Sequence, residues 1–441
     1  MKPYILSLLV SLCVLNSVQS QTTVSGGIYS STTWTKANSP YILQGDVVVF
    51  GGVDLNIEPG TVIKFDNNAQ IVLRGNLKAI GTSTDSIYFT SNSNTPAIGD
   101  YKGIYVDVNG GVPFGQPTNQ INMAYCVVSY SANFLNFRSQ HNGPYQFKFC
   151  RFHHNRYVNS DFRTSGNTTS FDNCLFEDNI DCLNGGGENG ALYVTNCKFI
   201  NNVRGTNGGI VNHCVYIGNT VFGAYMYQQV KNSYFKGNNI GIKSDHHGNT
   251  RVEGNLIFNN NIGVEIDRMG IDPSIVFKNN KICSNTTWNV KYNFSWNVDF
   301  SDNCWCSNDS AFIRSKIRDG YQDPAYGLTK FTYDDSCSDT DTLPASLTVS
   351  NTIKSGNNET SMRLFPNPAS ATTTVDIIEV AEQATYDIQI VDLTGKSILV
   401  LNDVKSGKNT LNISSIDAGI YFIHLSRFGN YIATSKLIIV R

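Results

Sequence analysis

The sequence predicts an all-β chain in which a solenoid of short strands precedes a small, separate β-domain. Three observations predict it: a pattern that returns about every 22 residues between Tyr125 and Asn308, short alternating apolar runs upstream, and alternating strands after Met362. Repeats of this length stack so that each covers its neighbour's apolar face. Charged residues make up only 15% of the chain and the net charge is −2, which excludes the electrostatic footprint of nucleic-acid binding.

The recurring pattern is a small residue, any residue, a large apolar residue, two more residues and then Asn. The first and third positions share one side of a strand, and their occupants are of the kind that is buried. The Asn falls at a turn, where its amide can bond to the equivalent Asn one coil away. The copies are Cys150-Phe152-Asn155, Cys174-Phe176-Asn179, Cys197-Phe199-Asn202, Cys214-Tyr216-Asn219, Ser233-Phe235-Asn238, Asn255-Ile257-Asn260, Asn280-Ile282-Asn285 and Asn303-Trp305-Asn308, with Cys126-Val128-Ser131 as a weaker first copy.

The upstream region breaks into short runs that Gly, Pro, Asn and Asp separate, as expected for strands and turns. The predicted strands are Asp46–Phe50, Val53–Ile57, Thr61–Phe65, Gln70–Leu73, Asn76–Ile80 and Ser86–Thr90. With these features, residues 21–337 resemble the right-handed parallel β-helix family, the fold of pectate lyases and of many bacterial surface proteins. Tyr41 to Ser91 is similar to the opening coils of secreted β-helix proteins of the Bacteroidetes.

The N-terminus is expected to be a secretory signal peptide, residues 1–20. Lys2 supplies the positive start, Ile5 to Leu15 an apolar run, and Val18-Gln19-Ser20 a small-residue cleavage site. The alternative, a membrane anchor, needs a run of about 20 apolar residues, and this one is shorter. No membrane span is expected once the signal is removed.

The C-terminal segment, residues 362–441, resembles the type IX secretion C-terminal sorting domain of the Bacteroidetes. The motifs stand in order as LFPNPAS (Leu364 to Ser370), IQIVDLTGK (Ile388 to Lys396), IDAGIYFIHL (Ile416 to Leu425) and a basic, apolar finish. The resemblance implies a small β-sandwich that the type IX translocon recognises, and a protein that is secreted or displayed on the outer surface by way of the periplasm. An Ig-like binding domain is the alternative. Residues 338–361, rich in Ser, Thr, Asn and Asp, are predicted to be a cleavable linker.

Five cysteines share the first repeat position: Cys126, Cys150, Cys174, Cys197 and Cys214. Stacked coils hold equivalent atoms parallel and about 4.8 Å apart, whereas disulfides need converging Cβ atoms at about 3.8 Å. A buried ladder of free thiols is therefore expected. For the later Cys283, Cys304, Cys306 and Cys337, a disulfide that ties the C-terminal cap remains open.

The candidate site lies on two neighbouring coils, where the repeat places Lys243 over Glu265, Asp245 over Asp267 and His246 over Arg268, with His247 and Arg251 nearby. The resemblance to lyases implies a Lys, His or Arg base and a cation that neutralises a uronate. We therefore expect Lys243, His246 and Arg268 as catalytic candidates, with substrate contacts from Asp245, His247, Glu265, Asp267 and Arg251. No cofactor is required, although Asp245 and Asp267 are candidate calcium ligands.

Two function classes remain open from the sequence: a non-catalytic surface protein that contacts polysaccharide along one flank, and a polysaccharide lyase that acts on uronate glycans by β-elimination. A solvated face with ion pairs explains the same charged residues without any ligand. A second, weaker cluster combines Arg138, His153, His154, Arg156, Asp161 and Arg163. Paired-Asp and Gly-His-Gly signatures of the polygalacturonase branch are absent from the sequence.

Overall fold

The computed structural model describes residues 21–107, 120–137, 143–159, 168–185, 191–226, 228–244, 250–267, 275–333, 361–378, 385–392, 396–427 and 430–440. The chain divides into two compact units, Met1–Ile353 and Lys354–Arg441. The predicted signal peptide and the whole of the predicted linker lie outside the described residues, so these two boundaries stay predictions.

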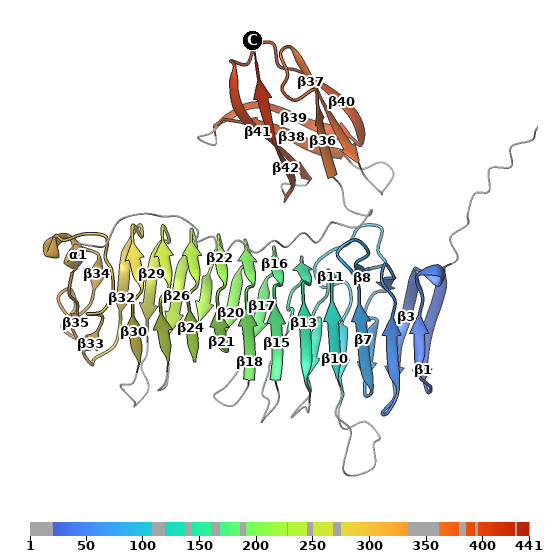
Figure 1. Ribbon diagram of the computed structural model, residues 1–441, viewed down its shortest axis with the longest axis horizontal. Coiled ribbons are helices and arrows are strands. Elements are labelled where there is room, and N and C mark those ends of the chain that lie inside the picture. Colours follow the sequence, from blue (N-terminus) through green and yellow to red (C-terminus); the bar gives the residue numbers. More distant parts are fainter. Residues whose placement is uncertain are drawn as a thin grey trace, which may run out of the picture. The chain divides into compact units, whose positions relative to one another are not determined.

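The first unit is a right-handed parallel β-helix with three parallel sheets (Figure 1). The largest has 15 strands; β1 (Thr22–Ile28) pairs with β3. The other strands follow in the order β12 (Leu135–Phe137), β9 (Gly103–Val106), β6 (Gln70–Leu73), β3 (Tyr41–Val49), β5 (Val62–Phe65), β8 (Ile87–Ser91), β11 (Cys126–Ser129), β14 (Arg151–His153), β16 (Leu175–Glu177), β19 (Lys198–Ile200), β22 (Val215–Ile217), β25 (Tyr234–Lys236), β28 (Leu256–Phe258) and β31 (Lys281–Cys283).

The other two sheets have 11 and 7 strands. The 11-stranded sheet runs β2 (Thr32–Trp34), β4 (Asp54–Ile57), β7 (Asn76–Ile80), β10 (Ile121–Ala124), β13 (Tyr145–Lys148), β15 (Thr168–Asp172), β18 (Ala191–Thr195), β21 (Ile210–Asn212), β24 (Gln229–Lys231), β27 (Arg251–Glu253) and β30 (Val276–Lys278). The seven-stranded sheet runs β17 (Asp181–Asn184), β20 (Arg204–Asn207), β23 (Phe222–Tyr225), β26 (Ile240–Ser244), β29 (Ile262–Ile266), β32 (Trp288–Tyr292) and β34 (Ile317–Arg318).

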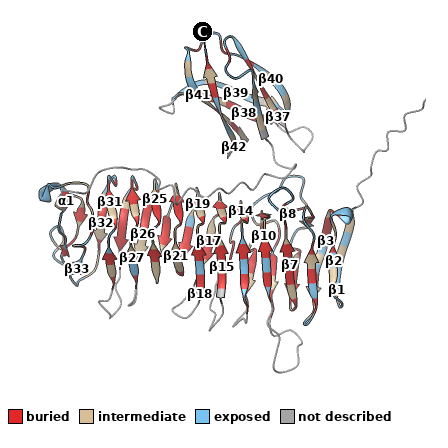
Figure 2. Ribbon diagram, in the orientation of Figure 1, coloured by how far each residue is buried: buried red, intermediate tan, exposed pale blue. Residues whose placement is uncertain are grey.

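Stacked aromatic rings fill the middle of the solenoid, as the repeat predicts. Phe176 lies 5.0 Å from Phe152 and 4.6 Å from Phe199 between ring centroids, and both pairs are nearly parallel. The stack continues through Tyr216 and Phe235 at 4.7 and 4.6 Å. All five side chains are fully buried, and buried residues mark every coil of the unit (Figure 2). The predicted register of the coils is therefore confirmed.

The predicted Asn ladder is present at the corner between the 15-stranded and seven-stranded sheets. From Asn155 through Asn179, Asn202, Asn219, Asn238 and Asn260, each backbone N–H donates to the side-chain oxygen of the next Asn at 2.9–3.1 Å. The side-chain amide of each donates to a carbonyl oxygen of an earlier coil, as Asn179 does to Phe152 at 2.8 Å. The ladder satisfies buried turn groups that would otherwise lack partners.

The residue type at the first repeat position changes along the stack, from Cys in the earlier coils to Ser and Asn in the later ones. Cys126, Cys150, Cys174, Cys197 and Cys214 are buried free thiols, as predicted. Beyond Cys214 the position holds Ser233, Asn255, Asn280 and Asn303. The side-chain oxygen of each accepts a hydrogen bond at 3.0 Å from the backbone N–H of the equivalent residue one coil earlier, beginning with that of Cys214. A hydrogen-bonded ladder thus replaces the thiol ladder in the later coils.

The C-terminal cap closes the stack with the short helix α1 (Ser310–Ser315) and the paired strands β33 (Val298–Asp299) and β35 (Thr329–Lys330). The carboxylate of Asp309 caps α1 by accepting from the backbone of Ala311 at 2.9 Å. A disulfide joins Cys283 to Cys306 across adjacent coils, which decides the question that the sequence left open. Cys337 lies outside the described residues. A 3₁₀ turn, Lys36–Asn38, is the other short helical element described.

The second unit consists of two antiparallel sheets, which matches the predicted β-sandwich. One sheet has the order β36 (Ser361–Phe365), β37 (Thr372–Ile378) and β40 (Gly407–Asn412). The other has the order β39 (Ser397–Lys405), β38 (Thr385–Val391), β41 (Gly419–Arg427) and β42 (Asn430–Ile439). Alternate residues of both sheets, such as Val375, Ile388 and Ile423, form its buried core.

Candidate functional site

A column of polar residues runs along the outer side of the seven-stranded sheet. The strand register places equivalent residues of successive coils next to one another, from Asn184 to Arg318. We call it the polar column; its members are Asn184, Asn207, Tyr225, Lys243, Glu265, Lys291 and Arg318. The predicted pairing of Lys243 with Glu265 is part of it.

Two features of the sequence build this flank. The preceding Asn ladder fixes where each strand of the seven-stranded sheet begins. Within the strands, Gly205, Gly223 and Gly241 lie so close to the next coil that an added Cβ would stand 2.1–2.8 Å from the carbonyl oxygen of Gly223, Gly241 or Gly263. Glycine is therefore required at these positions, and it lets the coils approach beside the polar column.

Glu265 is held between two lysines of neighbouring coils. Its carboxylate lies 3.6 Å from the ammonium nitrogen of Lys243 and 3.4 Å from that of Lys291. The Glu265 side chain is only 7% exposed, compared with 25% for Lys243 and 29% for Lys291. The column thus places a buried carboxylate between two partly exposed cations.

Asp267 and Asn293 extend this network beside the column. The carboxylate of Asp267 lies 2.6 Å from the ammonium nitrogen of Lys243 and accepts a hydrogen bond from the amide of Asn293 at 2.7 Å. The side-chain oxygen of Asn293 in turn accepts from the guanidinium of Arg318. The network connects four successive coils, from β26 to β34.

The electrostatic environment keeps both ends of the Lys243–Asp267 pair charged. Burial disfavours the ammonium form of Lys243, but the hydrogen bond and the charge of Asp267 outweigh it and raise its pKa. Burial also disfavours the Asp267 carboxylate, but hydrogen bonds from Lys243 and Asn293 outweigh it and lower its pKa. For Glu265, burial and then the neighbouring Asp267 raise the pKa.

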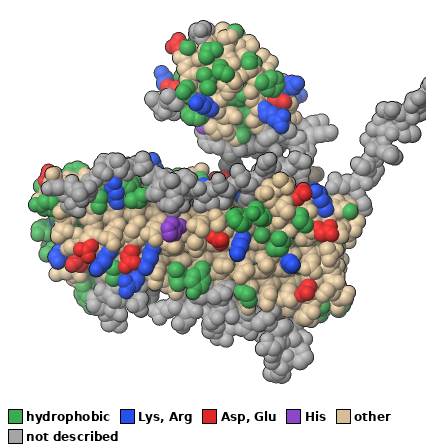
Figure 3. All heavy atoms as spheres, viewed as in Figure 1, with side chains coloured by type: hydrophobic (Ala, Val, Ile, Leu, Met, Phe, Trp, Pro, Cys, Tyr) green, Lys and Arg blue, Asp and Glu red, His purple; other side chains and the backbone are tan. Residues whose placement is uncertain are grey.

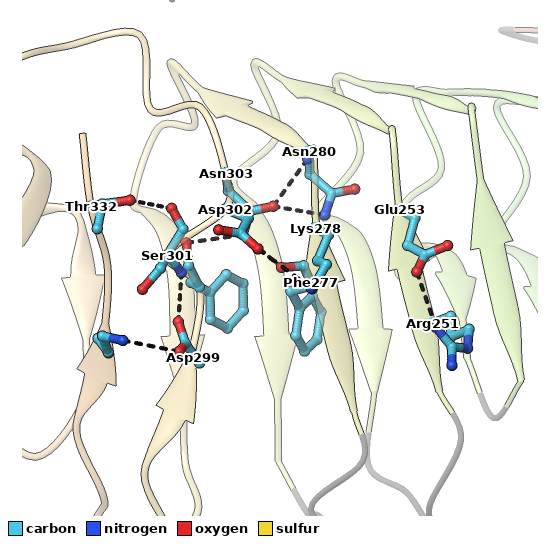
Figure 4. Close-up of polar contacts among 12 residues, drawn as sticks. Arg251, Glu253, Phe277, Lys278, Asn280, Asp299, Ser301, Asp302, Asn303 and Thr332 are labelled. Atoms are coloured by element: carbon cyan, nitrogen blue, oxygen red, sulfur yellow. Dashed lines mark hydrogen bonds and ion pairs between the residues drawn. The ribbon is translucent and has the colours of Figure 1, made fainter. Parts of the chain in front are cut away.

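The structure brings together only part of the predicted site. Lys243, Glu265 and Asp267 lie in one network, as described above. Arg251 lies on the 11-stranded sheet instead, where its guanidinium is 3.3 Å from the carboxylate of Glu253 on the same strand (Figure 4). The candidates Asp245, His246, His247 and Arg268 lie outside the described residues, so their roles stay predictions.

Further ion pairs lie on the outer side of the 11-stranded sheet and on the cap. Lys231 pairs with Glu253 at 2.8 Å and Lys278 with Asp302 at 3.5 Å, the latter drawn in Figure 4. In the view of Figure 3, acidic and basic side chains alternate toward the C-terminal end of the solenoid. Most of these groups are about half exposed or more, and pairs of this kind contribute little to stability.

The second predicted cluster is assembled in part. The Nδ1 atoms of His153 and His154 lie 3.0 Å apart, and the ring of Tyr130 lies 5.7 Å from that of His154 between centroids. The guanidinium carbon of Arg156 lies 5.7 Å from the centroid of the Tyr157 ring. Arg138, Asp161 and Arg163 lie outside the described residues.

Sequence reasoning missed Lys291, Asn293 and Arg318. The prediction covered two coils only, although Lys243, Glu265, Lys291 and Arg318 follow one another at 22, 26 and 27 residues, close to the spacing of the repeat. Extending the repeat by one further coil would have found Lys291. Arg318 follows the helix of the cap, where the Asn pattern has ended.

The described residues do not fit a calcium site. The carboxylate of Asp267 is bonded to Lys243, and that of Glu265 lies between two lysines, so positive charge already occupies the space a cation would take. The proposed partner ligand Asp245 is not among the described residues.

In the cap, the sulfurs of Cys283, Cys304 and Cys306 lie within 4.8 Å of one another, but the Cys283–Cys306 disulfide leaves no thiolate pair for a metal.

Comparison with known proteins agrees with both units. Residues 363–440 match the family model "Secretion system C-terminal sorting domain", and residues 26–124 match "Pectate-lyase like beta helix domain". The chain therefore combines a β-helix passenger with a C-terminal sorting domain of the type IX secretion system. It is exported to the cell surface or secreted. Among the described residues, no helix is long and apolar enough to cross a membrane.

Two individual proteins show limited similarity. "Protein bark beetle" of Drosophila melanogaster is 38% identical over 82 residues, which is 18% of this chain and 3% of that protein. The A-module of mannuronan C-5 epimerase AlgE4 from Azotobacter vinelandii superposes with a TM-score of 0.41 and 14% identity, covering 70% of this chain and 88% of that structure. The first match is short and the second is distant, so neither assigns an activity to this chain.

Proposed function

We propose that this exported β-helix contacts an acidic polysaccharide along the polar column of the seven-stranded sheet. The observation that carries the proposal is the repetition of partly exposed cations, Lys243, Lys291 and Arg318, at equivalent places on three of the four strands from β26 to β34. Coils stack about 4.8 Å apart, so a polymer that lies along the column meets Lys243, then Lys291 two coils further, and Arg318 on the coil after that.

The network carries one more positive charge than negative charges, which favours an acidic ligand. Lys243, Lys291 and Arg318 carry three positive charges, while Glu265 and Asp267 carry two negative ones. Because Glu265 is almost completely buried, its carboxylate positions the two lysines rather than meeting a ligand. Tyr225, next to Lys243 in the column, is partly exposed and adds a ring on which a sugar can stack.

The lyase alternative has less support from the described residues. A general base must be able to release its proton near neutral pH. The pKa of Lys243 is raised by its bond to Asp267, so Lys243 remains protonated and suits charge neutralisation rather than proton abstraction. The other base candidates, His246 and Arg268, are outside the described residues. A non-catalytic binding role is therefore the better-supported proposal.

The test is retention of the full exported protein on acidic glycans. Affinity electrophoresis through gels with polygalacturonate, alginate or a neutral glucan compares wild type with the double variant Lys243→Gln/Lys291→Gln. We expect retention by at least one acidic polymer, a loss of about tenfold in the double variant, and little retention by the neutral glucan. The matched control, Lys278→Gln/Lys330→Gln, removes two exposed lysines from elsewhere on the solenoid.

Equal retention of the two double variants would contradict the assignment of the column, and absence of retention by every polymer would contradict glycan binding. Release of unsaturated product, followed by ultraviolet absorbance in the same mixtures, would instead support the lyase. Repeating that assay with a chelator tests the calcium expectation.

A further inference from the structure

Exposed apolar side chains concentrate on the C-terminal cap of the solenoid. In the described part of the first unit, eight large apolar side chains are exposed, and five of them belong to the cap: Trp296, Phe312, Tyr321, Leu328 and Tyr333. The other three are spread along the rest of the solenoid as Tyr29, Ile98 and Tyr193. Figure 3 shows hydrophobic side chains on the surface at the end that carries α1. Exposed apolar groups that gather in this way indicate a contact surface.

A pocket of about 560 Å³ opens among these residues. It is formed over the paired strands β33 and β35, and its apolar wall consists of Tyr321, Leu328 and Phe331. We call it the cap pocket. A cavity of this size, with aromatic walls and a few polar groups, can hold a ring-shaped ligand such as a sugar residue.

The ring of Tyr321 is supported on one face. The guanidinium carbon of Arg314 lies 4.5 Å from the ring centroid of Tyr321 and 4.8 Å from that of Phe331, so the cation lies close to both rings. Tyr321 is nevertheless 68% exposed. The exposed surface of its ring is therefore the part turned away from Arg314, and a ligand can stack there.

The buried carboxylate of Asp319 holds this arrangement in place. One of its oxygens accepts hydrogen bonds from the guanidinium of Arg314 at 2.6 Å and from the backbone N–H of Thr329 at 2.8 Å. The other oxygen accepts from the backbone N–H of Tyr321 at 3.0 Å. The same side chain thus fixes the backbone of Tyr321 and the cation beneath its ring. A platform that is ordered before binding lowers the entropic cost of binding.

The charges of the cap pocket are balanced. Arg314 is paired with Asp319, and the ammonium nitrogen of Lys330 lies 3.3 Å from the carboxylate of Asp299. The pocket therefore suits the uncharged face of a sugar ring, which stacks on an aromatic side chain, better than a free carboxylate. The exposed amide nitrogen of Asn297, which also lines the pocket, can donate to a sugar hydroxyl.

One loop connects the cap pocket with the end of the polar column. The guanidinium carbon of Arg318, the last member of the column, lies 5.2 Å from the centroid of the Tyr326 ring. Tyr326 and Tyr321 both belong to the loop of residues 319–327. This loop is closed by a hydrogen bond from the N–H of Gly320 to the carbonyl oxygen of Gly327 at 3.0 Å. A polymer on the column can therefore continue into the pocket.

We propose that the cap pocket is an aromatic subsite in which Tyr321 stacks on one sugar ring of the acidic polysaccharide that lies along the polar column. The inference rests on the proposed function and adds a second kind of recognition to it. The column meets the carboxylates, whereas the cap pocket meets the ring itself. Together they distinguish an acidic glycan from a polyanion without sugar rings.

Affinity electrophoresis of the full exported protein tests the subsite. The gels contain either the acidic glycan that retains wild type or poly-glutamate, which offers carboxylates without sugar rings. On the glycan we expect Tyr321→Ala to lose about five- to tenfold in affinity and Tyr321→Phe to remain close to wild type. On poly-glutamate, Tyr321→Ala should equal wild type. The matched control is Tyr29→Ala, at an exposed tyrosine whose ring stacks on Phe50 at 4.6 Å near the start of the solenoid.

Salt separates the subsite from the column. Raising the ionic strength screens the lysines, so the effect of Lys243→Gln/Lys291→Gln should shrink, while the ratio between wild type and Tyr321→Ala should persist. Glycan retention that depends on these two lysines but not on Tyr321 would overturn the subsite and leave the proposed function standing. Absence of retention of wild type by every glycan would overturn both.

Three further outcomes would also overturn the subsite. Equal losses for Tyr321→Ala and Tyr29→Ala would show that any exposed ring has the same effect. A loss in Tyr321→Phe as large as in Tyr321→Ala would assign the effect to the hydroxyl rather than to stacking. A wild-type dimer in sedimentation that Tyr321→Ala dissociates would assign the cap to a second copy of the chain.

Discussion

The side-chain oxygen of Asn179 accepts hydrogen bonds from both the backbone N–H and the side-chain amide of Asn155, one coil earlier, at 2.9 and 3.0 Å. Replacing Asn179 by Ala leaves this buried N–H without a partner and frees the carbonyl of Phe152 as well. We expect a loss of about 3 kcal/mol in the free energy of unfolding. Denaturant titration measures it.

The control for that prediction is Asn261→Ala, at an exposed Asn that bonds to Asn239 at 2.9 Å on the surface. It should cost less than about 1 kcal/mol. Equal costs for the two variants would mean that the inner ladder contributes no more than a surface bond.

Phe176 tests the aromatic stack. Phe176→Ala removes a ring that contacts Phe152 and Phe199, and the cavity should cost about 3–5 kcal/mol. Phe176→Asp, which places an unpaired charge in the core, should abolish cooperative melting. Tyr193→Ala on the outer side serves as the control. A melting curve unchanged by Phe176→Asp would show that the coil register is wrong.

The thiol ladder predicts the outcome of a thiol titration. Cys126, Cys150, Cys174, Cys182, Cys197 and Cys214 are buried and free, so the denatured, unreduced protein should release at least six reactive thiols. The native protein should react slowly, because burial removes the thiols from reagent and raises the pKa of Cys174 and Cys197. Fewer than six thiols after denaturation would indicate disulfides among these six cysteines.

The Lys243–Asp267 pair predicts a pH dependence of stability. The pKa of Asp267 is lowered by folding, so its contribution is complete above the ordinary Asp value of about 3.9 and is lost as pH falls through the folded pKa. The pKa of Lys243 is raised, so its contribution is complete below about 10.4 and is lost as pH rises through the folded pKa.

The variant Asp267→Asn removes the contribution of Asp267 and the main cause of the raised pKa of Lys243. The melting temperature of wild type should therefore exceed that of the variant between about pH 4 and pH 10, by an amount equivalent to roughly 1 kcal/mol or less. The difference should shrink at both extremes. A difference that does not change with pH would assign it to packing rather than to the ion pair.

The sorting domain predicts the fate of a truncated chain. Deleting residues 362–441 removes the segment that matches the secretion sorting domain but leaves the core of the solenoid intact. The truncated protein should fold and accumulate in the periplasm, which cell fractionation and surface protease treatment can measure. Surface display at the wild-type level would exclude a sorting role for this domain.

The repeated parts of the fold could be predicted from the sequence because the same pattern of inward residues and turn residues recurs from coil to coil. Gln70–Leu73 and Asn76–Ile80 were predicted with their observed bounds, and the Phe, Cys and Asn positions fixed the register of the later coils. The cap could not be predicted in this way. The helix Ser310–Ser315 of the cap does not recur in the other coils. Its N-cap residue, Asp309, is a local sequence signal that no repeat reinforces.

The candidate site was predicted less completely for a related physical reason. Inward positions are restricted by packing, so Phe, Tyr and Ile recur there, whereas outward positions vary freely from coil to coil. The pairing of Lys243 with Glu265 followed from register alone. The role of Lys291 as the second cation beside Glu265 depends on side-chain reach across the coils, which only the structure supplies.

The Cys283–Cys306 disulfide also determines how the solenoid carries mechanical load. Tension that enters from the C-terminal side of a parallel stack peels coils away one after another, since each rung is held only by its neighbour. The covalent bond transmits that tension directly from Cys306 to Cys283, which are 23 residues apart in sequence. The enclosed coil, which carries Lys291, is bypassed and stays folded while the protein is pulled.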